Sequence, residues 1–491
     1  MKNEDVVGVF LKAGILSDKS AIDYVIDNDL DAEDIAEKML VSKMFFATKE
    51  VIGTLLDKES INGDAKVEVR PISKKGLAKD IDGSVRITSK PDEEQSTKTI
   101  TDFVAYFSDR YEKIKNILLG HSDVKNPISI SRLVGKNNER DVSVICIVSS
   151  MDVSKNGHRI LEVEDPTGPM TAIVMKDKNV GEDSLILDEI VALKGGVSNG
   201  TLFVDEIIFP EIPVVNNTEK KVDDPVSAVF ISDIHIGSNE YLQKVEDKFI
   251  GWLKGGSDGA GNVKYICIAG DTVDGVGIYP GQKQDLKIQD IYAQYRAFEE
   301  FIERIPEYIE IVIIPGNHDA VRLAEPQPAF GKDLMPNITG FDNVHLGPNP
   351  CRVSLHGIDG REGVRALMYH GYSFTRIIDA VPTLRVNGMD KPEYVMTELL
   401  RKRHLAPMYG STALMPSGDD PHVISSVPDI FHTGDLHSFA LKSYRGVLMV
   451  SSSTFQGQTA FMDRVGHQSN PGKVTVVRLD TMKPKVLDLV A

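Results

Sequence analysis

Five short polar segments in the second half of the chain each follow a run of apolar residues. Such runs are typical of buried strands in an α/β sheet, and loops at the carboxyl ends of these strands are where such folds place functional groups. The segments carry carboxylate, amide and imidazole groups, which are ligands of divalent cations. They are Asp233-Ile234-His235, Gly270-Asp271, Gly316-Asn317-His318-Asp319, His370-Gly371 and Gly434-Asp435-Leu436-His437. Together they predict one site that holds two metal ions and acts on phosphate esters.

The length of 491 residues suggests about three domains, and 41% apolar residues are sufficient for buried cores. The three cysteines, Cys146, Cys267 and Cys351, are far apart, which argues against a disulfide framework or a zinc ribbon and fits a reducing compartment. The sequence has neither a signal-peptide pattern at its start nor a run of about 20 apolar residues. We therefore expect a soluble, cytoplasmic protein without a membrane partner.

The net charge of −17 argues against binding nucleic acid by bulk electrostatics, because affinity for a polyanion rests on many Lys and Arg contacts. Net charge can conceal a local basic patch, however. Arg401-Lys402-Arg403-His404 is one candidate. A solvated helix end explains the same cluster equally well.

The first quarter of the chain changes character twice. Residues 1–56 have apolar residues at helical spacing and predict a helical N-terminal module. Residues 57–100 are polar and predict a disordered linker. Residues 101–125 return to helical spacing and predict a connecting helix.

Residues 126–215 contain five short β-rich runs separated by turn signals, which predict a small Greek-key barrel of the OB type. Barrels of this type often bind single-stranded nucleic acid through stacking aromatics and a basic groove. Phe203 is the only clear aromatic residue on these strands. A structural or docking role is therefore as well supported as direct strand binding.

From residue 226 to residue 491, short apolar strands alternate with loops and helices. Five of the strands end at the polar segments, and further strands near 447–450 and 474–477 would complete two packed sheets. The expected fold class is thus multidomain, with an α/β two-sheet core preceded by the barrel and the helical module.

The spacing within the polar segments suggests individual roles. Asp233 and His235 are two positions apart, so in extended backbone both would point the same way and could share one metal ion. Asp271 follows a strand and a glycine, which favours close approach and a bridging carboxylate. His370 and His437 supply further imidazoles.

The segment Gly316-Asn317-His318-Asp319 is the most specific of the five. Asn317 offers a neutral oxygen ligand, and the adjacent His318 would lie beside the metal ions as a general acid. Asp319 could fix the tautomer of His318.

Five further histidines fall outside this pattern, and we assign them to surface or core. They are His345, His356, His404, His422 and His467.

These residues resemble the calcineurin-like metallophosphoesterases, and more narrowly the small subunit of archaeal family D DNA polymerases. The narrower resemblance rests on four stretches, and it extends from about residue 100 to the end. The stretches are 275–282 (GVGIYPGQ), 403–410 (RHLAPMYG), 427–434 (VPDIFHTG) and 453–459 (STFQGQT).

The resemblance implies a 3′-to-5′ exonuclease that proofreads for a separate large polymerase subunit. It implies a first metal ion held by Asp233, His235, Asp271 and His437, and a second held by Asn317 and His370. His318 would protonate the departing 3′ oxygen. The implied cofactors are two Mn²⁺ or Mg²⁺ ions. The implied partners are the large subunit, the 3′ end of DNA and, through the complex, a sliding clamp.

One residue departs from the family pattern, which ends Gly-His-x-His, because Asp435 replaces the first of those histidines. Asp435 can still ligate a hard cation, or His432 could substitute, or the second metal site is weakened. A non-catalytic scaffold subunit is therefore the alternative to a nuclease. A general phosphatase is the third hypothesis, although it would not require the barrel. Polymerisation has no motif here, such as a phosphate-binding loop ending in Lys-Ser/Thr.

Overall fold

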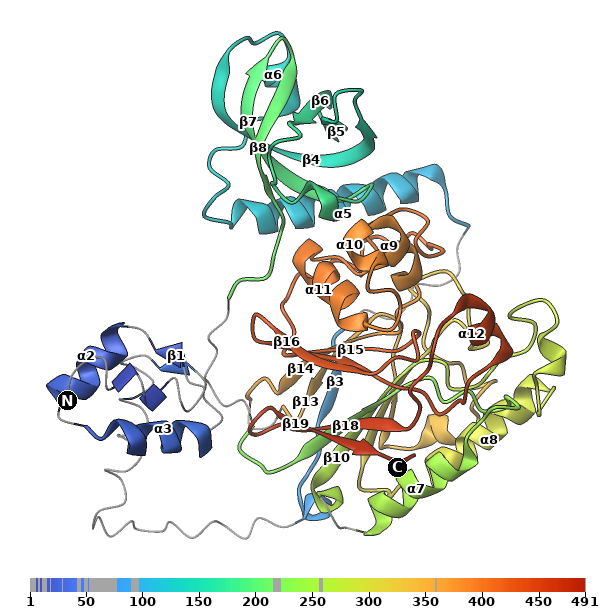
Figure 1. The fold of residues 1–491 in the computed structure, drawn as a ribbon. Helices are drawn as coiled ribbons and strands as arrows, with labels where there is room; N and C mark the ends of the chain where they lie inside the picture. Colours follow the sequence, from blue (N-terminus) through green and yellow to red (C-terminus); the bar gives the residue numbers. More distant parts are fainter. Residues whose placement is uncertain are drawn as a thin grey trace. The chain divides into compact units, whose positions relative to one another are not determined.

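The computed structural model describes residues 6–7, 9–10, 16–17, 19–28, 30–41, 46–47, 52, 77–89, 97–214, 222–255, 259–357 and 360–490. Contacts divide the chain into two compact units, Met1–Lys74 and Lys75–Ala491, and each is described by itself (Figure 1).

Two helices form most of what is described of the smaller unit. The elements are β1 (Leu16–Ser17), α2 (Lys19–Asp27), α3 (Ala32–Val41) and β2 (Phe46–Ala47), with β1 parallel to β2. Val25, Ile35 and Met39 are buried between the helices. Asp31 caps α3, since its carboxylate accepts a hydrogen bond from the backbone N–H of Glu33 at 2.9 Å. Both helices lie within the stretch where apolar spacing predicts helices.

Two six-stranded sheets form the centre of the larger unit. The first has the order β12-β11-β10-β9-β18-β19, and β9 to β12 are parallel. Its strands are β9 (Ser227–Ile231), β10 (Val263–Ala269), β11 (Glu310–Ile314), β12 (Val344–Leu346), β18 (Lys473–Arg478) and β19 (Lys483–Asp488). The second has the order β16-β17-β15-β14-β13-β3. Its strands are β3 (Val85–Ile87), β13 (Cys351–Leu355), β14 (Val364–Tyr369), β15 (Ile430–Thr433), β16 (Ala440–Tyr444) and β17 (Val447–Ser451). The two packed sheets expected from the apolar runs are thus present.

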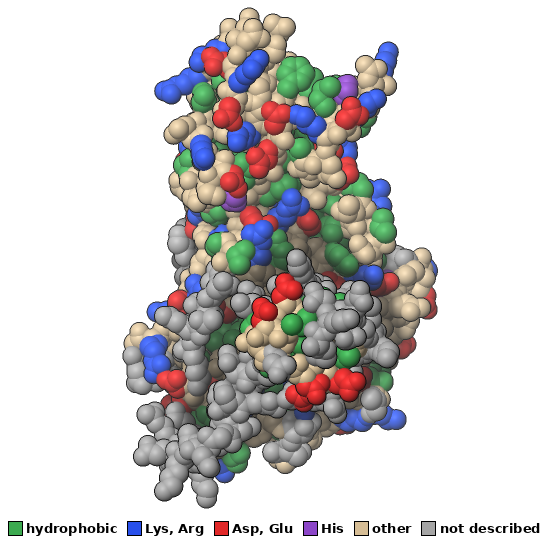
Figure 2. Space-filling view, turned by 60° about the vertical axis from the view of Figure 1, so that its left-hand side comes forward, with side chains coloured by type: hydrophobic (Ala, Val, Ile, Leu, Met, Phe, Trp, Pro, Cys, Tyr) green, Lys and Arg blue, Asp and Glu red, His purple; other side chains and the backbone are tan. Residues whose placement is uncertain are grey.

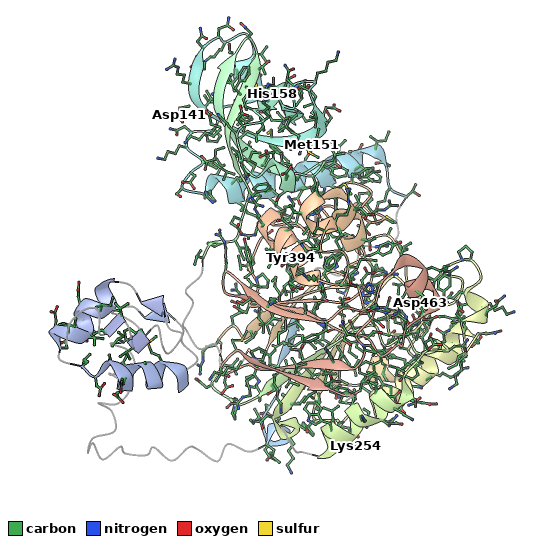
Figure 3. The ribbon with its side chains drawn as sticks, in the orientation of Figure 1. Asp141, Met151, His158, Lys254, Tyr394 and Asp463 are labelled. Carbon is green, nitrogen blue, oxygen red and sulfur yellow. The ribbon has the colours of Figure 1, made fainter. Side chains whose placement is uncertain are left out.

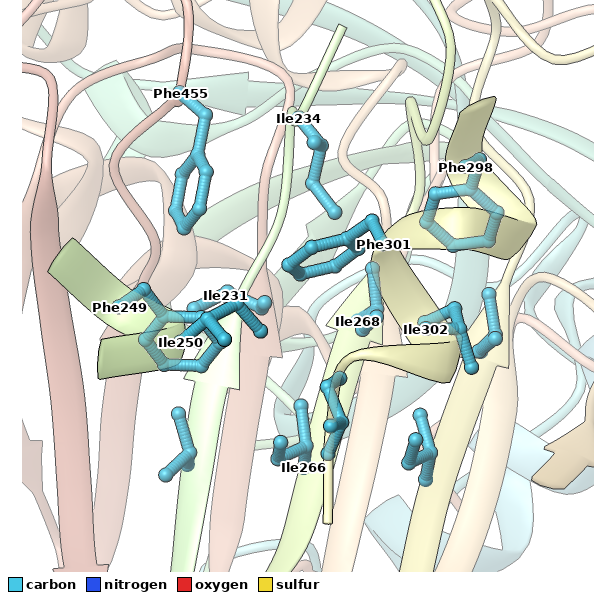
Figure 4. Close-up of a cluster of buried hydrophobic side chains, with 14 of the residues drawn as sticks. Ile231, Ile234, Phe249, Ile250, Ile266, Ile268, Phe298, Phe301, Ile302 and Phe455 are labelled. Atoms are coloured by element: carbon cyan, nitrogen blue, oxygen red, sulfur yellow. The ribbon is translucent and has the colours of Figure 1, made fainter. Parts of the chain in front are cut away.

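Alternating side chains on the strands fill two different cores, as the period of two in a strand requires. On β10, Tyr265 and Cys267 point into the core between the sheets, where they meet residues such as Val353 and Met368 of the second sheet. The neighbouring Ile266 and Ile268 point to the opposite face and pack against helices (Figure 4). Because both faces are covered, β9, β10 and β11 are mostly apolar, and Ile266 to Ala269 form an uninterrupted apolar run on β10.

Helices cover the outer face of each sheet, so the larger unit has an α/β/β/α core (Figure 1). The covering helices are α7 (Gln243–Gly255) and α8 (Ile291–Glu303) on the first sheet, and α9 (Phe374–Ala380), α10 (Pro382–Arg385) and α11 (Pro392–Lys402) on the second. Shorter helices are η1 (Ala78–Asp80), α6 (Ile130–Leu133), η2 (Glu182–Ser184), η3 (Ala260–Asn262), η4 (Gln282–Gln284), η5 (Ile338–Gly340) and α12 (Ala460–Val465). Among the described helices, none is long and apolar enough to span a membrane.

Residues 139–208 form a closed five-stranded barrel with the order β4-β5-β6-β8-β7. The strands are β4 (Glu139–Val153), β5 (Arg159–Asp165), β6 (Gly168–Val174), β7 (Ile190–Ser198) and β8 (Thr201–Ile208). All neighbouring pairs are antiparallel except β6 and β8. On the visible face of the barrel, acidic and basic side chains are interspersed (Figure 2). Some of them form ion pairs, as Arg159 does with Asp183 at 2.7 Å. That face offers no continuous basic track for a nucleic acid.

Helix α5 (Ile100–Leu119), expected as a connecting helix, packs along the barrel. Tyr111, Ile114 and Leu118 are buried against it, and the hydroxyl of Tyr111 donates to the backbone oxygen of Ile145 at 3.1 Å. Arg110 on the same helix pairs with Asp420 of the core at 2.6 Å. Helix α5 therefore joins the barrel to the two-sheet core.

The basic cluster at the end of α11 is a second joint between barrel and core. Lys402 is buried, and its ammonium lies 2.8 Å from the carboxylate of Glu189 and 2.6 Å from the backbone oxygen of Ser184. Arg403 donates to the backbone oxygen of Ile424 at 2.7 Å. Both sequence interpretations of 401–404, a nucleic-acid patch and a solvated helix end, are therefore wrong for Lys402, Arg403 and His404, because burial commits them to internal partners.

The expectation of a disordered linker over residues 57–100 is wrong for residues 77–89. Strand β3 pairs antiparallel with β13, with Val85 opposite Leu355 and Ile87 opposite Val353. In the sequence, the barrel therefore lies between β3 and the other strands of the core, so the barrel does not simply precede the core. Residues 57–76 and 90–96 of this region lie outside the described residues.

Replacing Lys402 by Ala should lower the free energy of unfolding by about 3–5 kcal/mol, because the carboxylate of Glu189 would remain buried without its partner. Urea denaturation would measure the loss. Lys244→Ala, an exposed lysine on α7, should change stability by less than about 0.5 kcal/mol. If the two variants are equally stable, the buried ion pair of Lys402 with Glu189 does not stabilise the joint between barrel and core.

Candidate metal centre

The five polar segments lie at the carboxyl ends of five strands. Those at 233–235, 270–271 and 316–319 follow β9, β10 and β11 of the first sheet, and those at 370–371 and 434–437 follow β14 and β15 of the second. Hydrogen bonds cross between the sheets at this edge: Asp435 N donates to Asp233 Oδ1 at 3.1 Å, and His370 Nδ1 faces the backbone oxygen of Ala269 at 2.8 Å. The strand ends of both sheets thus converge on one place, as the sequence predicts.

The backbone at this place is unusual. Five of the predicted ligands have positive φ, at 52° for Asp233, 54° for His235, 49° for Asp271, 67° for Asp435 and 52° for His437. Asp233 and His235 do not share extended backbone, as their spacing suggested. The left-handed conformation at both residues turns the chain so that their side chains converge. Non-glycine residues in this region cost free energy and concentrate at functional sites.

Two glycines allow the segments to approach this closely. A Cβ on Gly316 would collide with a carboxylate oxygen of Asp271, and a Cβ on Gly434 would collide with a carboxylate oxygen of Asp233. Each glycine belongs to one of the predicted segments. The glycine of the Gly316-Asn317 pair and that of the Gly434-Asp435 pair are therefore required because a larger side chain would not fit there.

The first group of ligand atoms joins Asp233, His235 and His437. The Nε2 atoms of the two histidines are 3.0 Å apart, and His437 Nε2 lies 3.4 Å from Asp233 Oδ1. Ligands around an ion at ~2.1 Å are separated by about 3 Å when they are at right angles. With 4.0 Å between His235 Nε2 and Asp233 Oδ1, these separations are compatible with groups around one small cation.

A second group joins Asp271 and His370 with Asp233. Oδ2 of Asp271 is 3.6 Å from His235 Nε2 and 3.4 Å from His370 Nε2, so this carboxylate stands between the two groups. Asn317 Oδ1 lies 2.8 Å from His370 Nε2. The bridging position expected for Asp271 and the pairing of Asn317 with His370 are both compatible with this geometry.

The donor set fits divalent cations. His370 uses Nδ1 to donate to the backbone oxygen of Ala269, so the Nε2 of a neutral His370 turns its lone pair toward three oxygens, on Asn317, Asp271 and Asp435. Burial opposes a charge on His370, yet the carboxylates of Asp271, Asp233 and Asp435 raise the pKa of its imidazole well above the usual value. The cluster thus demands positive charge, which metal ions would supply.

Asp274 orients two histidines, although the sequence interpretation did not select it. Its Oδ1 lies 3.0 Å from Nδ1 of His235, and its backbone oxygen lies 2.8 Å from Nδ1 of His318. Since a carbonyl oxygen only accepts, Nδ1 of His318 carries the proton and Nε2 faces the site. The signal that was overlooked is the second carboxylate three positions after Asp271, directly before the stretch 275–282.

Asp319 does not have the role predicted for it. Its carboxylate accepts hydrogen bonds from Thr272 Oγ1 at 2.5 Å and from Gly316 N at 2.8 Å, while Asp274 holds the tautomer of His318. Asp319 therefore braces two metal-site loops against each other. Burial, with the charge of Asp271, raises its pKa to about 6.

Asp435 points into the site, with Oδ1 3.7 Å from His370 Nε2. Burial raises its pKa to about 7; His370 opposes this rise, and Asp233 adds to it. His432 lies within β15, is buried and bonds Ser452 Oγ at 2.8 Å, so it is a strand residue and does not replace the missing histidine. Asp435, and not His432, is therefore the side chain of this segment that faces His370.

A cavity of about 320 Å³ opens onto the cluster. Its polar lining includes His235, Asp271, Asn317, His318, Asp435 and His437, and its apolar lining includes Ile278, Tyr279, Tyr372, Met389, Leu436 and Met462. His467 also lines it, with Nε2 donating to the backbone oxygen of Leu436 at 2.7 Å. The default assignment of His467 to surface or core therefore missed a residue of the site.

The other four histidines have internal or ionic partners. His404 and His422 are buried beside Asp420, His345 pairs with Glu310 at 2.8 Å, and His356 pairs with Asp224 at 3.1 Å. None of these four lines the cavity at the cluster.

Comparisons with known proteins place the chain in a family. The family model for the B-subunits of DNA polymerases alpha and epsilon matches residues 228–441. The DNA polymerase II small subunit of Archaeoglobus fulgidus is 37% identical over 503 residues, covering 97% of this chain and 97% of the relative. That of Methanothermobacter thermautotrophicus is 35% identical over 497 residues, covering 98% of each. The chain belongs to the archaeal DNA polymerase II small subunits.

A further DNA polymerase II small subunit, from Methanocaldococcus jannaschii, is 38% identical over 437 residues, covering 86% of this chain and 70% of the relative. A solved structure described as a novel archaeal phosphodiesterase aligns with 53% of this chain and 99% of its own at 11% identity and a TM-score of 0.26, which is too low to carry an argument.

Two of the stretches that resemble the DNA polymerase II small subunits support the site. Gln282, in the stretch 275–282, donates to the backbone oxygen of Asp274 at 2.9 Å. Gln456, in the stretch 453–459, donates to Oδ1 of the same residue at 3.0 Å. These stretches thus fix the residue that orients His235 and His318.

Asp274→Asn should weaken the binding of Mn²⁺ by about 10- to 100-fold, because an amide no longer polarises the His235 imidazole as a carboxylate does. Isothermal titration with Mn²⁺ would measure the change. Asp141→Asn, a matched change on the barrel (Figure 3), should leave the affinity unaltered. If both variants bind Mn²⁺ with the same affinity, Asp274 does not contribute to metal binding.

Proposed function

We propose that this chain is the proofreading subunit of a family D DNA polymerase and removes nucleotides from the 3′ end of DNA. The observation that carries the proposal is the position of the Asp271 carboxylate between two groups of carboxylate and imidazole ligands. It is supported by membership in the small-subunit family and by the apolar wall of the cavity, which suits a nucleobase.

In this proposal, Asp233, His235, Asp271 and His437 hold one divalent cation, and Asn317, His370 and Asp435 hold the other, with Asp271 shared. Mn²⁺ suits the mixed oxygen and imidazole set, and Mg²⁺ is the second candidate. When bound, such a pair activates water and stabilises negative charge on phosphoryl oxygens.

His318 is the proposed general acid. The backbone oxygen of Asp274 holds its Nδ1–H at 2.8 Å, which leaves Nε2 directed to the cavity. From Nε2, a protonated His318 would donate to the 3′ oxygen that leaves when the terminal phosphodiester is cleaved. Asp319 would keep the loop of His318 in place through Thr272 and Gly316.

The remaining parts suit assembly. We propose that the barrel is of the OB type, on the support of its order β4-β5-β6-β8-β7 and its parallel pair β6–β8. The proposed domains are a helical module at 1–56, α5 with the barrel, and a core formed by residues 226–491 together with β3. The proposed partners are the large polymerase subunit, DNA and, through the complex, a sliding clamp.

A catalytically weak scaffold subunit is the second candidate function. Its support is Asp435, because a carboxylate replaces an imidazole ligand beside His370. The carboxylates of Asp233 and Asp271 also lie near His370, so Asp435 adds a third negative charge there.

The proposal predicts that the full-length chain with Mn²⁺ shortens a 5′-labelled single-stranded oligonucleotide from its 3′ end. His318→Ala should lower kcat by about 10²- to 10⁴-fold, since a general acid contributes on this scale. Gel analysis of the products, with and without the large subunit, would measure both. His345→Ala, outside the site, serves as the matched control.

Asp435→His separates the two candidate functions. Digestion by the natural chain that disappears in His318→Ala supports the nuclease. Digestion seen only after Asp435→His would assign the natural chain to the scaffold class.

A further inference from the structure

We propose that a hollow next to the metal centre binds the single-stranded DNA that precedes the terminal nucleotide, through stacking on Tyr372 and Tyr409 and a phosphate contact from Arg376. This inference rests on the proposed nuclease function and names how its substrate is held. The hollow has a volume of about 700 Å³.

The hollow and the cavity at the cluster are adjacent and share part of their lining. Tyr372, Thr375 and Asp435 line both, so the two spaces meet at the start of α9 and at the metal-site loop after β15. A strand whose last phosphodiester lies at the cluster would therefore pass Tyr372 before it enters the hollow.

The sizes suit this division. The cavity at the cluster, about 320 Å³, is at the small end of ligand pockets, where one nucleotide fits. The hollow is about twice as large, which leaves room for the chain that precedes the terminal nucleotide. A small phosphate ester would use only the first space, whereas an oligonucleotide would use both.

The lining of the hollow supplies flat apolar surfaces. Tyr409 is 62% exposed, and its ring makes a T-shaped contact with the ring of Phe107, with 5.9 Å between the centroids. Phe103 of α5 and Leu323, 45% exposed, complete the apolar part of the lining. Exposed aromatic rings of this kind serve as stacking platforms for bases of any sequence.

Charge plays a smaller part. Arg376 is exposed and has no ion pair with any residue that the structure describes, so its guanidinium is available to a phosphate. Asp379 and Asp435 lie in the same lining and offset its charge. We therefore expect binding that depends mainly on stacking and only weakly on salt, in agreement with the net charge of −17.

The test compares two substrates and measures binding separately. Binding of a fluorescein-labelled dT₈ to the full chain in Ca²⁺ would be followed by anisotropy, and hydrolysis in Mn²⁺ by the release of nitrophenol from the p-nitrophenyl ester of thymidine 5′-monophosphate. Tyr409→Ala and Arg376→Ala should each weaken dT₈ binding about tenfold. Both should leave kcat/KM for the small ester unchanged.

Tyr394→Ala, an exposed tyrosine on α11 outside both spaces (Figure 3), and Arg132→Ala on α6 are the matched controls and should change neither value. Thermal denaturation would confirm that the variants are folded. Unaltered dT₈ binding in Tyr409→Ala and Arg376→Ala would overturn the inference, as would absence of dT₈ binding by the natural chain. If Tyr409→Ala and Arg376→Ala bind dT₈ normally but no longer bind the large subunit, the hollow is a contact site for that protein and the inference is overturned.

The outcome for the proposed function is read separately. If the chain hydrolyses neither DNA nor the ester, the nuclease proposal fails, and the anisotropy result still decides whether the hollow binds a strand.

Discussion

Buried carboxylates and imidazole lone pairs lie close together at one edge of the two sheets and repel one another. The rest of the site depends on this constraint. Asp233, Asp271 and His370 are all buried, and their ligand atoms lie within a few ångströms of one another. Neighbouring imidazoles lower the pKa of Asp271 in spite of burial, and neighbouring carboxylates raise that of His370. The carboxylates are thus stabilised by positive charge nearby, which a charged His370 supplies in part, and a pair of cations at the centre would supply it in full.

Holding such groups together requires a rigid frame. Parallel strands buried on both faces supply it, and the loops that follow them are kept in left-handed conformations by hydrogen bonds from other loops. Asp319 illustrates this bracing, because it ties the loop after β11 to Thr272 in the loop after β10. The strained backbone at Asp233 and His235 is held by the loop after β10, because their N–H groups donate to the backbone oxygens of Gly270 and Asp271 at 3.0 and 3.1 Å.

Much of this arrangement could be predicted because it is local in sequence. An apolar run followed by a ligand-bearing segment identifies a strand and the loop at its end, and five repetitions locate the centre. The barrel strands could be recognised in the same way from their apolar runs and turn residues.

The parts that were missed depend on contacts between distant positions. Lys402 is separated from Glu189 by 213 positions, and neither residue alone indicates an internal ion pair. The role of Asp274 follows from where the backbone of the next loop passes, which spacing does not reveal. Asp233 and His235 were expected in extended backbone because alternation is the default for a strand end, whereas the ring of loops imposes positive φ.

The pairing of β3 with β13 has a consequence for how the chain is made. Ribosomal synthesis proceeds from the N-terminus, so Val85–Ile87 emerges long before Cys351–Leu355, and the hydrogen bond from Thr88 to Arg352 spans 264 positions. During that interval β3 lacks its native partner, while the barrel and the first four strands of the other sheet can already form. The second sheet is therefore completed at this edge late in synthesis, and a nascent chain stalled before residue 351 would carry an unpaired strand open to wrong partners.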